Sequence, residues 1–106
     1  ASPTTYRPSP PMGAVTCINW PYQYQGPPIT AVTGAGAAPI VVVSTTGDPA
    51  TPYEWGVALA SQLESAHLVT FNGEGHTAYG QGNACVNSTV DNYFLKGKVP
   101  ATDPNC

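Results

Sequence analysis

Three segments with regular spacing of apolar residues follow one another in the second half of the chain. The run Pro39–Thr45 is continuous and rich in valine, which is typical of a strand covered on both faces, as in a parallel sheet. Trp55, Leu59 and Leu63 then recur at helical spacing and predict a helix. The segment His67–Phe71 predicts a second strand.

The helix between the two strands carries signals for its first turn. We expect Thr51 to be the N-cap, with Pro52 at the first helical position and Glu54 at the capping-box position. The apolar spacing extends the helix to about Glu64 or Ser65.

A second helix is predicted for Cys85–Leu95, and Gly97 would end it. Its apolar side is expected to contain Val86, Val90, Tyr93 and Phe94. Strand, helix, strand, loop and helix form a βαβ unit with a following helix, whose crossover should be right-handed. A sheet of two parallel strands leaves edges without partners, so Val41–Val43 predict a neighbouring strand and a larger sheet.

The first part of the chain has a different composition. Residues 1–38 hold much of the proline and glycine, which predicts turns and extended loop. A short strand or helical turn is expected at Ala14–Asn19. We therefore divide the chain into a lead-in, residues 1–38, and an α/β segment, residues 39–106.

Charged residues are scarce and exclude some classes of function. They make up 8% of the chain, with a net charge of -3 and three basic residues, Arg7, Lys96 and Lys98. Nucleic acid is not an expected partner, because phosphate binding needs clustered Lys and Arg. No apolar run approaches the roughly 20 residues of a membrane span. The low charge favours a secreted protein or a fragment whose surface partly packs against something else. The chain has no initiator Met and no signal-peptide pattern, so we expect a mature or excised segment.

The three cysteines do not form a metal-binding pattern. Cys17, Cys85 and Cys106 include no Cys-x-x-Cys pair, and the histidines are not at ligand spacing, so we expect neither metal nor cofactor. Cys85 and Cys106 bracket the last helix and the tail, which favours a disulfide between them. Cys17 would then need a partner in an upstream segment. The alternative is that all three are reduced and buried.

Asp48 and His76 are the candidate catalytic residues. Each follows a predicted strand, and the carboxyl ends of parallel strands meet at one edge of a sheet. An acid followed by a histidine is the second half of the Ser…Asp…His order of α/β-hydrolases, but the chain has no Gly-x-Ser-x-Gly turn. In such a triad Asp48 would accept the Nδ1 proton of His76. The alternative for Asp48 is a simple turn or helix cap.

Three stretches carry a resemblance to a known family: Thr46–Tyr53, Gly73–Tyr79 and Cys85–Leu95. They resemble the C-terminal segment of secreted actinobacterial α/β-hydrolases of the tripeptidyl-aminopeptidase-like (TAP-like) family. The resemblance implies the C-terminal βαβα portion of an α/β-hydrolase fold, with Asp48 as triad acid and His76 as triad base. It also implies peptidase or esterase chemistry, a nucleophile in an upstream segment, and a secreted or cell-envelope location.

Two functions follow from these observations. The chain is either the C-terminal part of a secreted serine hydrolase or a non-catalytic module. In the first case an upstream Ser-bearing segment completes the site for peptide or ester hydrolysis, and the chain alone is inactive. In the second case the chain folds alone, binds a partner or serves a structural role, and carries a vestigial Asp–His pair.

Overall fold

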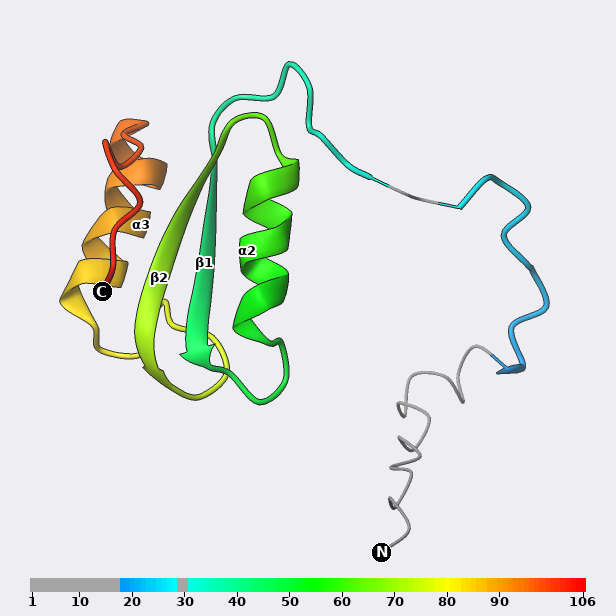
Figure 1. Cartoon of the computed structure of the whole chain (residues 1–106), viewed down its shortest axis with the longest axis horizontal. Helices are drawn as coiled ribbons and strands as arrows, with labels where there is room; N and C mark the ends of the chain where they lie inside the picture. Colours follow the sequence, from blue (N-terminus) through cyan, green and yellow to red (C-terminus); the bar gives the residue numbers. More distant parts are fainter. Residues whose placement is uncertain (1–17, 29–30) are drawn as a thin grey trace, which may run out of the picture.

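The structure, a computed structural model, describes residues 18–28 and 31–106. Its elements are β1 (Ile40–Gly47), α2 (Tyr53–Gln62), β2 (Ala66–Glu74) and α3 (Ala84–Lys96). The two strands pair in parallel, and the helices flank the small sheet on opposite sides (Figure 1). The predicted α/β class, the element order and the parallel pairing are therefore confirmed.

The continuous apolar run of β1 reflects a strand with a helix on each face. Val41 and Val43 pack toward the cluster on the α3 side. Ser44 lies toward α2, where its hydroxyl donates a hydrogen bond to the Tyr53 carbonyl (3.3 Å). Because successive side chains of a strand point to opposite faces, two covered faces require apolar or hydrogen-bonded residues at every position.

The core lies between the sheet and α3. It consists of Val69, Ala78, Val86 and Val90, with Val69 and Val86 fully buried. Tyr93 is half-buried and its hydroxyl donates to the Pro39 carbonyl (2.8 Å). Phe94, predicted on the same side of α3, lines a groove together with Val90 and Tyr93 but is 76% exposed and stays outside the core.

Two of the three apolar residues whose spacing predicted helix α2 are exposed. Trp55 is 65% exposed and Leu59 is also exposed, so neither belongs to the inner face. The half-buried positions of this segment also recur at helical spacing. They are Tyr53, Gly56, Ala60 and Leu63. A Cβ at Gly56 would lie only 2.5 Å from the Ser44 hydroxyl, so glycine allows the helix to approach β1 closely.

The start of α2 also differs from the prediction. The helix begins at Tyr53, its N-cap is Pro52, and no side chain caps it, so the expected cap by Thr51 and capping box with Glu54 are wrong. The helix ends at Gln62, slightly before the expected boundary. By contrast, α3 ends as predicted at Gly97, which adopts a left-handed conformation with φ 62°.

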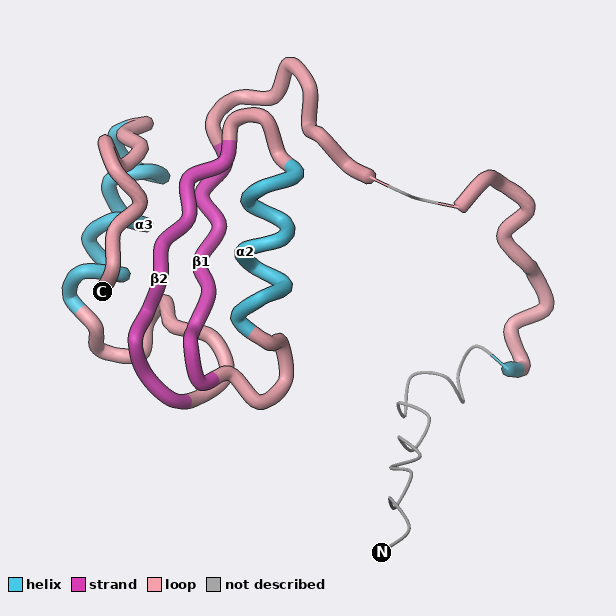
Figure 2. Tube along the Cα trace, in the orientation of Figure 1, coloured by secondary structure: helices cyan, strands magenta, loops and turns pink. Residues whose placement is uncertain are grey.

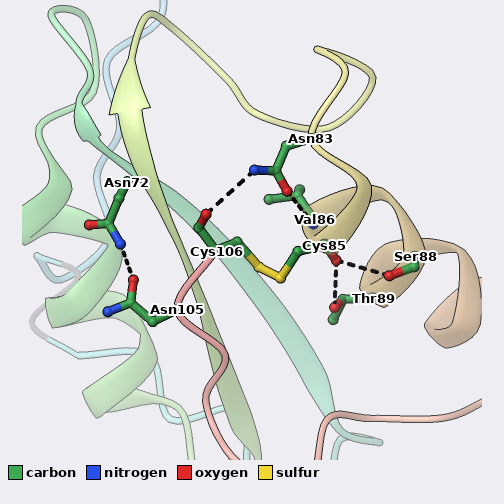
Figure 3. Close-up of a disulfide and its surroundings, with 8 residues drawn as sticks. All are labelled: Asn72, Asn83, Cys85, Val86, Ser88, Thr89, Asn105 and Cys106. Carbon is green, nitrogen blue, oxygen red and sulfur yellow. Dashed lines mark hydrogen bonds between the residues drawn. A yellow bond between two sulfur atoms is a disulfide. The ribbon is translucent and has the colours of Figure 1, made fainter.

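A tail covers the edge of β2 that faces away from β1. The Thr70 N–H donates to the Pro104 carbonyl (3.0 Å), and the Cys106 N–H donates to the Thr70 carbonyl (2.7 Å). The predicted disulfide between Cys85 and Cys106 is present and links this tail to α3 (Figure 3). Cys17 lies outside the described residues, as does most of the element predicted at Ala14–Asn19.

The other edge of the sheet belongs to β1. Within residues 18–28 and 31–106 no strand other than β2 pairs with it. Residues 31–39 form a loop that leads into β1 (Figure 2) and that turns at Gly34, where the Ala37 N–H donates to the Gly34 carbonyl (2.9 Å). A neighbouring strand for Val41–Val43 stays a prediction.

Candidate active site

Asp48 is the first residue after β1 and lies in a tight turn. The ladder between the strands shifts register between Thr45 and Gly47, just before this turn. One carboxylate oxygen, Oδ1, accepts hydrogen bonds from the Ala50 N–H (2.8 Å) and the Thr51 N–H (2.9 Å). Asp48 therefore caps its turn, which was the alternative role expected for it from the sequence.

The same carboxylate faces His76, which lies two residues beyond the end of β2. The Nδ1 atom of His76 is 2.9 Å from Oδ2 and 3.1 Å from Oδ1 of Asp48. The loops after both strands meet at the same end of the sheet, the lower end in Figure 1. The structure thus brings together the two side chains that sequence analysis selected, although they are 28 residues apart.

The backbone around His76 is shaped to reach Asp48. Gly75 has φ 115° and Thr77 has φ 69°, and a positive φ is unusual for a β-branched residue. The Gly75 N–H donates to the Gly47 carbonyl (3.1 Å), which ties the two loops together. The Thr77 N–H also points at Oδ2 of Asp48 (3.4 Å).

The two side chains differ in their exposure to solvent. The Asp48 side chain is 4% exposed and the His76 side chain is 53% exposed. Because Nδ1 is directed at the carboxylate, the opposite ring nitrogen, Nε2, is left on the exposed side of the imidazole. An imidazole held in this way presents Nε2 as the ring nitrogen through which a proton can be transferred.

Hydrogen bonding holds the pKa of the Asp48 carboxyl well below its ordinary value. The largest cause is the backbone N–H of Thr51, which is opposed by desolvation and then reinforced by His76, the Thr51 hydroxyl and the Ala50 N–H. Each donor stabilises the charged form. Asp48 therefore remains ionised at neutral pH and can stabilise a protonated imidazole without taking its proton.

Thr51 is a member of the site that sequence analysis assigned elsewhere. Its hydroxyl donates to Oδ2 of Asp48 (2.8 Å), and its Oγ1 lies 3.4 Å from Nδ1 of His76. The signal in the sequence was the spacing Asp-x-x-Thr, which is typical of a capped turn as well as of a helix start. The sequence around Thr51 does not distinguish a capped turn from a helix start. The contact with His76, 25 residues further along the chain, does.

The described residues supply no nucleophile at Nε2 of His76. Thr51 is the only hydroxyl in the described part of the chain that is hydrogen-bonded to the ring, and it lies at Nδ1, where the proton of a nucleophile is not accepted. Ser44 is buried and bonded to the Tyr53 carbonyl. His67 pairs with Val41 near the opposite end of the sheet and takes no part in the site.

Neither a metal site nor a membrane span emerges from the described residues. Across residues 18–28 and 31–106, no three His, Cys, Asp or Glu side chains are grouped so that they could hold a metal ion. In the same part of the chain no helix has the length and apolarity needed to cross a bilayer.

A parallel sheet that carries an acid after one strand and a histidine after the next corresponds to the C-terminal part of an α/β-hydrolase. The family described as TAP-like protein, one of the α/β-hydrolase families, matches residues 7–106. The chain belongs to this TAP-like family.

Curated relatives match most of this chain. Carboxylesterase B of Mycobacterium tuberculosis is 52% identical over 90 residues, which cover 85% of this chain and 17% of the relative. Serine protease Hip1 of the same organism is 45% identical over 91 residues, covering 86% and 17%. A tripeptidyl aminopeptidase of Streptomyces lividans is 37% identical over 91 residues, covering 85% and 17%. The chain thus spans 17% of the length of these relatives.

Proposed function

We propose that this chain is the C-terminal part of a serine hydrolase that cleaves peptide or ester bonds through a Ser–His–Asp triad. Asp48 is the acid, His76 is the base, and the serine belongs to a segment upstream of this chain. The observation that carries the proposal is the contact of 2.9 Å between Nδ1 of His76 and Oδ2 of Asp48, with Nε2 on the exposed side. The names of the relatives, a carboxylesterase, a serine protease and an aminopeptidase, support hydrolysis of these bonds.

In the proposed mechanism each side chain has a separate task. Nε2 of His76 takes the proton of the serine hydroxyl while the serine oxygen bonds to the carbonyl carbon of the substrate. The same proton then passes to the leaving amine or alcohol as its bond to carbon breaks. A water molecule then gives a proton to Nε2 while its oxygen bonds to the acyl carbon. The bond from that carbon to the serine oxygen breaks, the serine takes the proton back, and the carboxylic acid product is released. Throughout, Asp48 stays ionised and accepts the hydrogen bond from Nδ1.

The edge of β1 opposite β2, with which no strand of residues 18–28 and 31–106 pairs, is the surface on which we expect the rest of the hydrolase to dock. On the α3 side a groove beside this edge is lined by Val41, Val43, Tyr93 and Phe94. On the α2 side a second groove is lined by Val42, Trp55 and Leu59.

The occupant of this edge is the remainder of the hydrolase, because the matched relatives are about six times as long as the part they share with this chain. A strand added parallel to β1 would bring its own C-terminal loop to the end of the sheet that holds Asp48 and His76. The nucleophile would then arrive at the exposed side of the imidazole. The disulfide of the tail favours a secreted or cell-envelope location for the whole enzyme.

A serine-reactive fluorophosphonate probe and ester or peptide hydrolysis test the proposal. The chain alone should remain unlabelled, and labelling should appear when the upstream segment is joined to it. His76→Ala should then lower kcat/KM by about 10⁴-fold or more, because the base and the nucleophile act as a unit. His67→Ala is the matched control, since His67 lies near the other end of the sheet.

Equal hydrolysis by the His76→Ala enzyme would contradict the proposal. That result would favour the alternative, a non-catalytic binding or structural module in which Asp48 serves only as the cap of its turn.

A further inference from the structure

We propose that the edge of β2 that faces away from β1 is an interaction surface, and that its partner is the tail of a second copy of this chain. Within one chain this edge is occupied by the chain's own tail, residues 103–106, which the disulfide holds in place. Opening of the disulfide lets two copies exchange their tails.

The tail pairs with β2 as a short parallel strand. The Thr70 N–H donates to the Pro104 carbonyl (3.0 Å), and the Thr70 carbonyl accepts from the Cys106 N–H (2.7 Å). Asn105 is therefore the bridge partner of Thr70, in the parallel sense. Because the tail satisfies both backbone groups of Thr70, its departure leaves an open strand edge, which is a template for pairing with another chain.

Side-chain contacts before and after this bridge fix the register of the tail. The Oδ1 atom of Asp103 accepts a hydrogen bond from the Leu68 N–H (3.2 Å). The side-chain amide of Asn72 donates to the side-chain oxygen of Asn105 (Figure 3). A segment that replaces the tail must therefore offer an acceptor at each of these two positions to make the same contacts.

Cys106 connects the tail to α3 and to the core. Its sulfur is bonded to Cys85, and its carbonyl accepts a hydrogen bond from the Asn83 side-chain amide (3.4 Å) (Figure 3). Its side chain packs against the core between the sheet and α3. The vacated site would thus lack an apolar side chain as well as backbone partners, and burial of such a side chain favours its occupation.

A second copy of the chain supplies a segment that is shown to fit this site. Residues 98–102, which link α3 to the tail, belong to no helix or strand, so they can change direction without loss of an element. Reciprocal exchange of an identical element restores every contact and is a low-cost route to a dimer. In dilute solution the chain's own tail has the higher effective concentration, so exchange requires concentrated protein.

The disulfide determines whether exchange is possible, because a closed bond to Cys85 keeps the tail in its own chain. A dithiol such as dithiothreitol gives two electrons and two protons to this bond, which becomes two thiols, while the dithiol becomes a cyclic disulfide. After exchange, Cys106 of one protomer lies beside the partner's Cys85. Oxidised glutathione can then close a disulfide between the two copies and is itself reduced to two glutathione molecules.

The test mixes two chains that cannot form the internal disulfide. One carries Cys17→Ser and Cys85→Ser and keeps only Cys106, and the other carries Cys17→Ser and Cys106→Ser and keeps only Cys85. They are combined in equal amounts with reduced and oxidised glutathione. A size tag on one chain lets non-reducing electrophoresis separate the mixed dimer from the two same-chain dimers.

We expect the mixed dimer to exceed either same-chain dimer by about tenfold or more, because an exchanged tail holds its thiol close to the one thiol it can meet. Asp103→Ala in the chain that keeps Cys106 should lower the yield by about two- to tenfold, the ratio to which one hydrogen bond typically corresponds. Asp91→Ala is the matched control, since Asp91 accepts a hydrogen bond from the Tyr79 hydroxyl (2.8 Å), and should leave the yield unchanged.

Dimers in the proportions of random pairing, or no loss of the mixed dimer in Asp103→Ala, would overturn the inference. If the single-cysteine chains do not fold by circular dichroism, the Cys17→Ser chain is used instead, as equal parts of ¹⁴N- and ¹⁵N-labelled protein. This mixture is reduced with dithiothreitol at high concentration, freed of the dithiol and reoxidised. Disulfide-linked Cys85 and Cys106 peptides of mixed isotope support exchange, and their absence overturns it.

Discussion

At the scale of single residues, Asp48 belongs to two structures at once. Its Oδ1 caps the turn after β1, and its Oδ2 faces the imidazole of His76. Sequence analysis treated the cap and the catalytic acid as alternatives, because an Asp before a proline is common in turns. The geometry shows that the cap is itself a means of orienting the carboxylate toward the histidine.

The pKa of Asp48 predicts how stability depends on pH. The pKa is lower in the folded chain than the ordinary carboxyl value of about 3.9, so the unfolded chain takes up the proton first as the pH falls. The stability contributed by Asp48 is therefore complete above about pH 5 and is lost progressively below about pH 4. Denaturant unfolding of the wild type and of Asp48→Asn across this range measures the effect.

We expect Asp48→Asn to be less stable than the wild type at neutral pH and to change less on acidification. Parallel pH profiles for the two proteins would show that Asp48 does not carry this dependence.

At the scale of the elements, the sequence located the strands and helices well and their faces less well. Both strands and α3 lie where the pattern predicted, each slightly longer. The apolar spacing that predicted α2 does not mark its inner face, because Trp55 and Leu59 are exposed. The half-buried positions include two small residues, Gly56 and Ala60, and Gly56 lets α2 approach β1 closely. The pattern of hydrophobic residues does not indicate how closely a helix approaches a strand.

The close contact at Gly56 leads to a prediction for α2. A Cβ at this position would meet the Oγ and Cβ atoms of Ser44 at 2.5 and 2.6 Å, so Gly56→Ala must displace the helix or the strand. Overpacking usually costs about 1–3 kcal/mol, against a gain of up to about 1 kcal/mol in helix propensity. We expect a net loss of roughly 1–2 kcal/mol in the free energy of unfolding, measured by denaturant titration.

The exposed Val57→Ala substitution in the same helix is the control and should change stability by less than about 0.5 kcal/mol. Stabilisation by Gly56→Ala would mean that α2 does not approach β1 as closely as the structure indicates.

At the scale of the whole molecule, the disulfide connects the tail, β2 and α3. It closes a loop with a sequence separation of 21 residues, which by chain entropy contributes about 3 kcal/mol. We expect replacement of both Cys85 and Cys106 by alanine to lower the free energy of unfolding by about this amount. Proteolysis near Asn105 should also become faster, because the tail would then be held to β2 mainly by its hydrogen bonds at Leu68 and Thr70.

Equal stability of the oxidised wild type and the double alanine variant would contradict this prediction. The thiol of Cys17 should be blocked in the comparison, so that it cannot exchange with the other two cysteines.

The site could be predicted from the sequence only as far as its parts are local. Asp48 and His76 each follow a strand, and parallel pairing brings both to one end of the sheet. The role of Thr51 could not be predicted, because its hydroxyl has a local use in capping and a long-range use in the site. The proposed nucleophile could not be located, because in the proposed function it comes from a strand beside β1, which the described residues do not contain.

Among the described residues no strand pairs with the edge of β1 opposite β2, and this has a consequence for handling the chain in isolation. The strand carries no charged side chain, and charge is one of the devices by which exposed edges resist unwanted pairing. The backbone groups that would recruit the remainder of the enzyme can equally recruit another copy of the same strand. We therefore expect concentrated solutions to undergo sheet-mediated self-assembly. Synthesis in one continuous polypeptide with the proposed upstream segment should suppress it, because the correct neighbour would be the first one encountered.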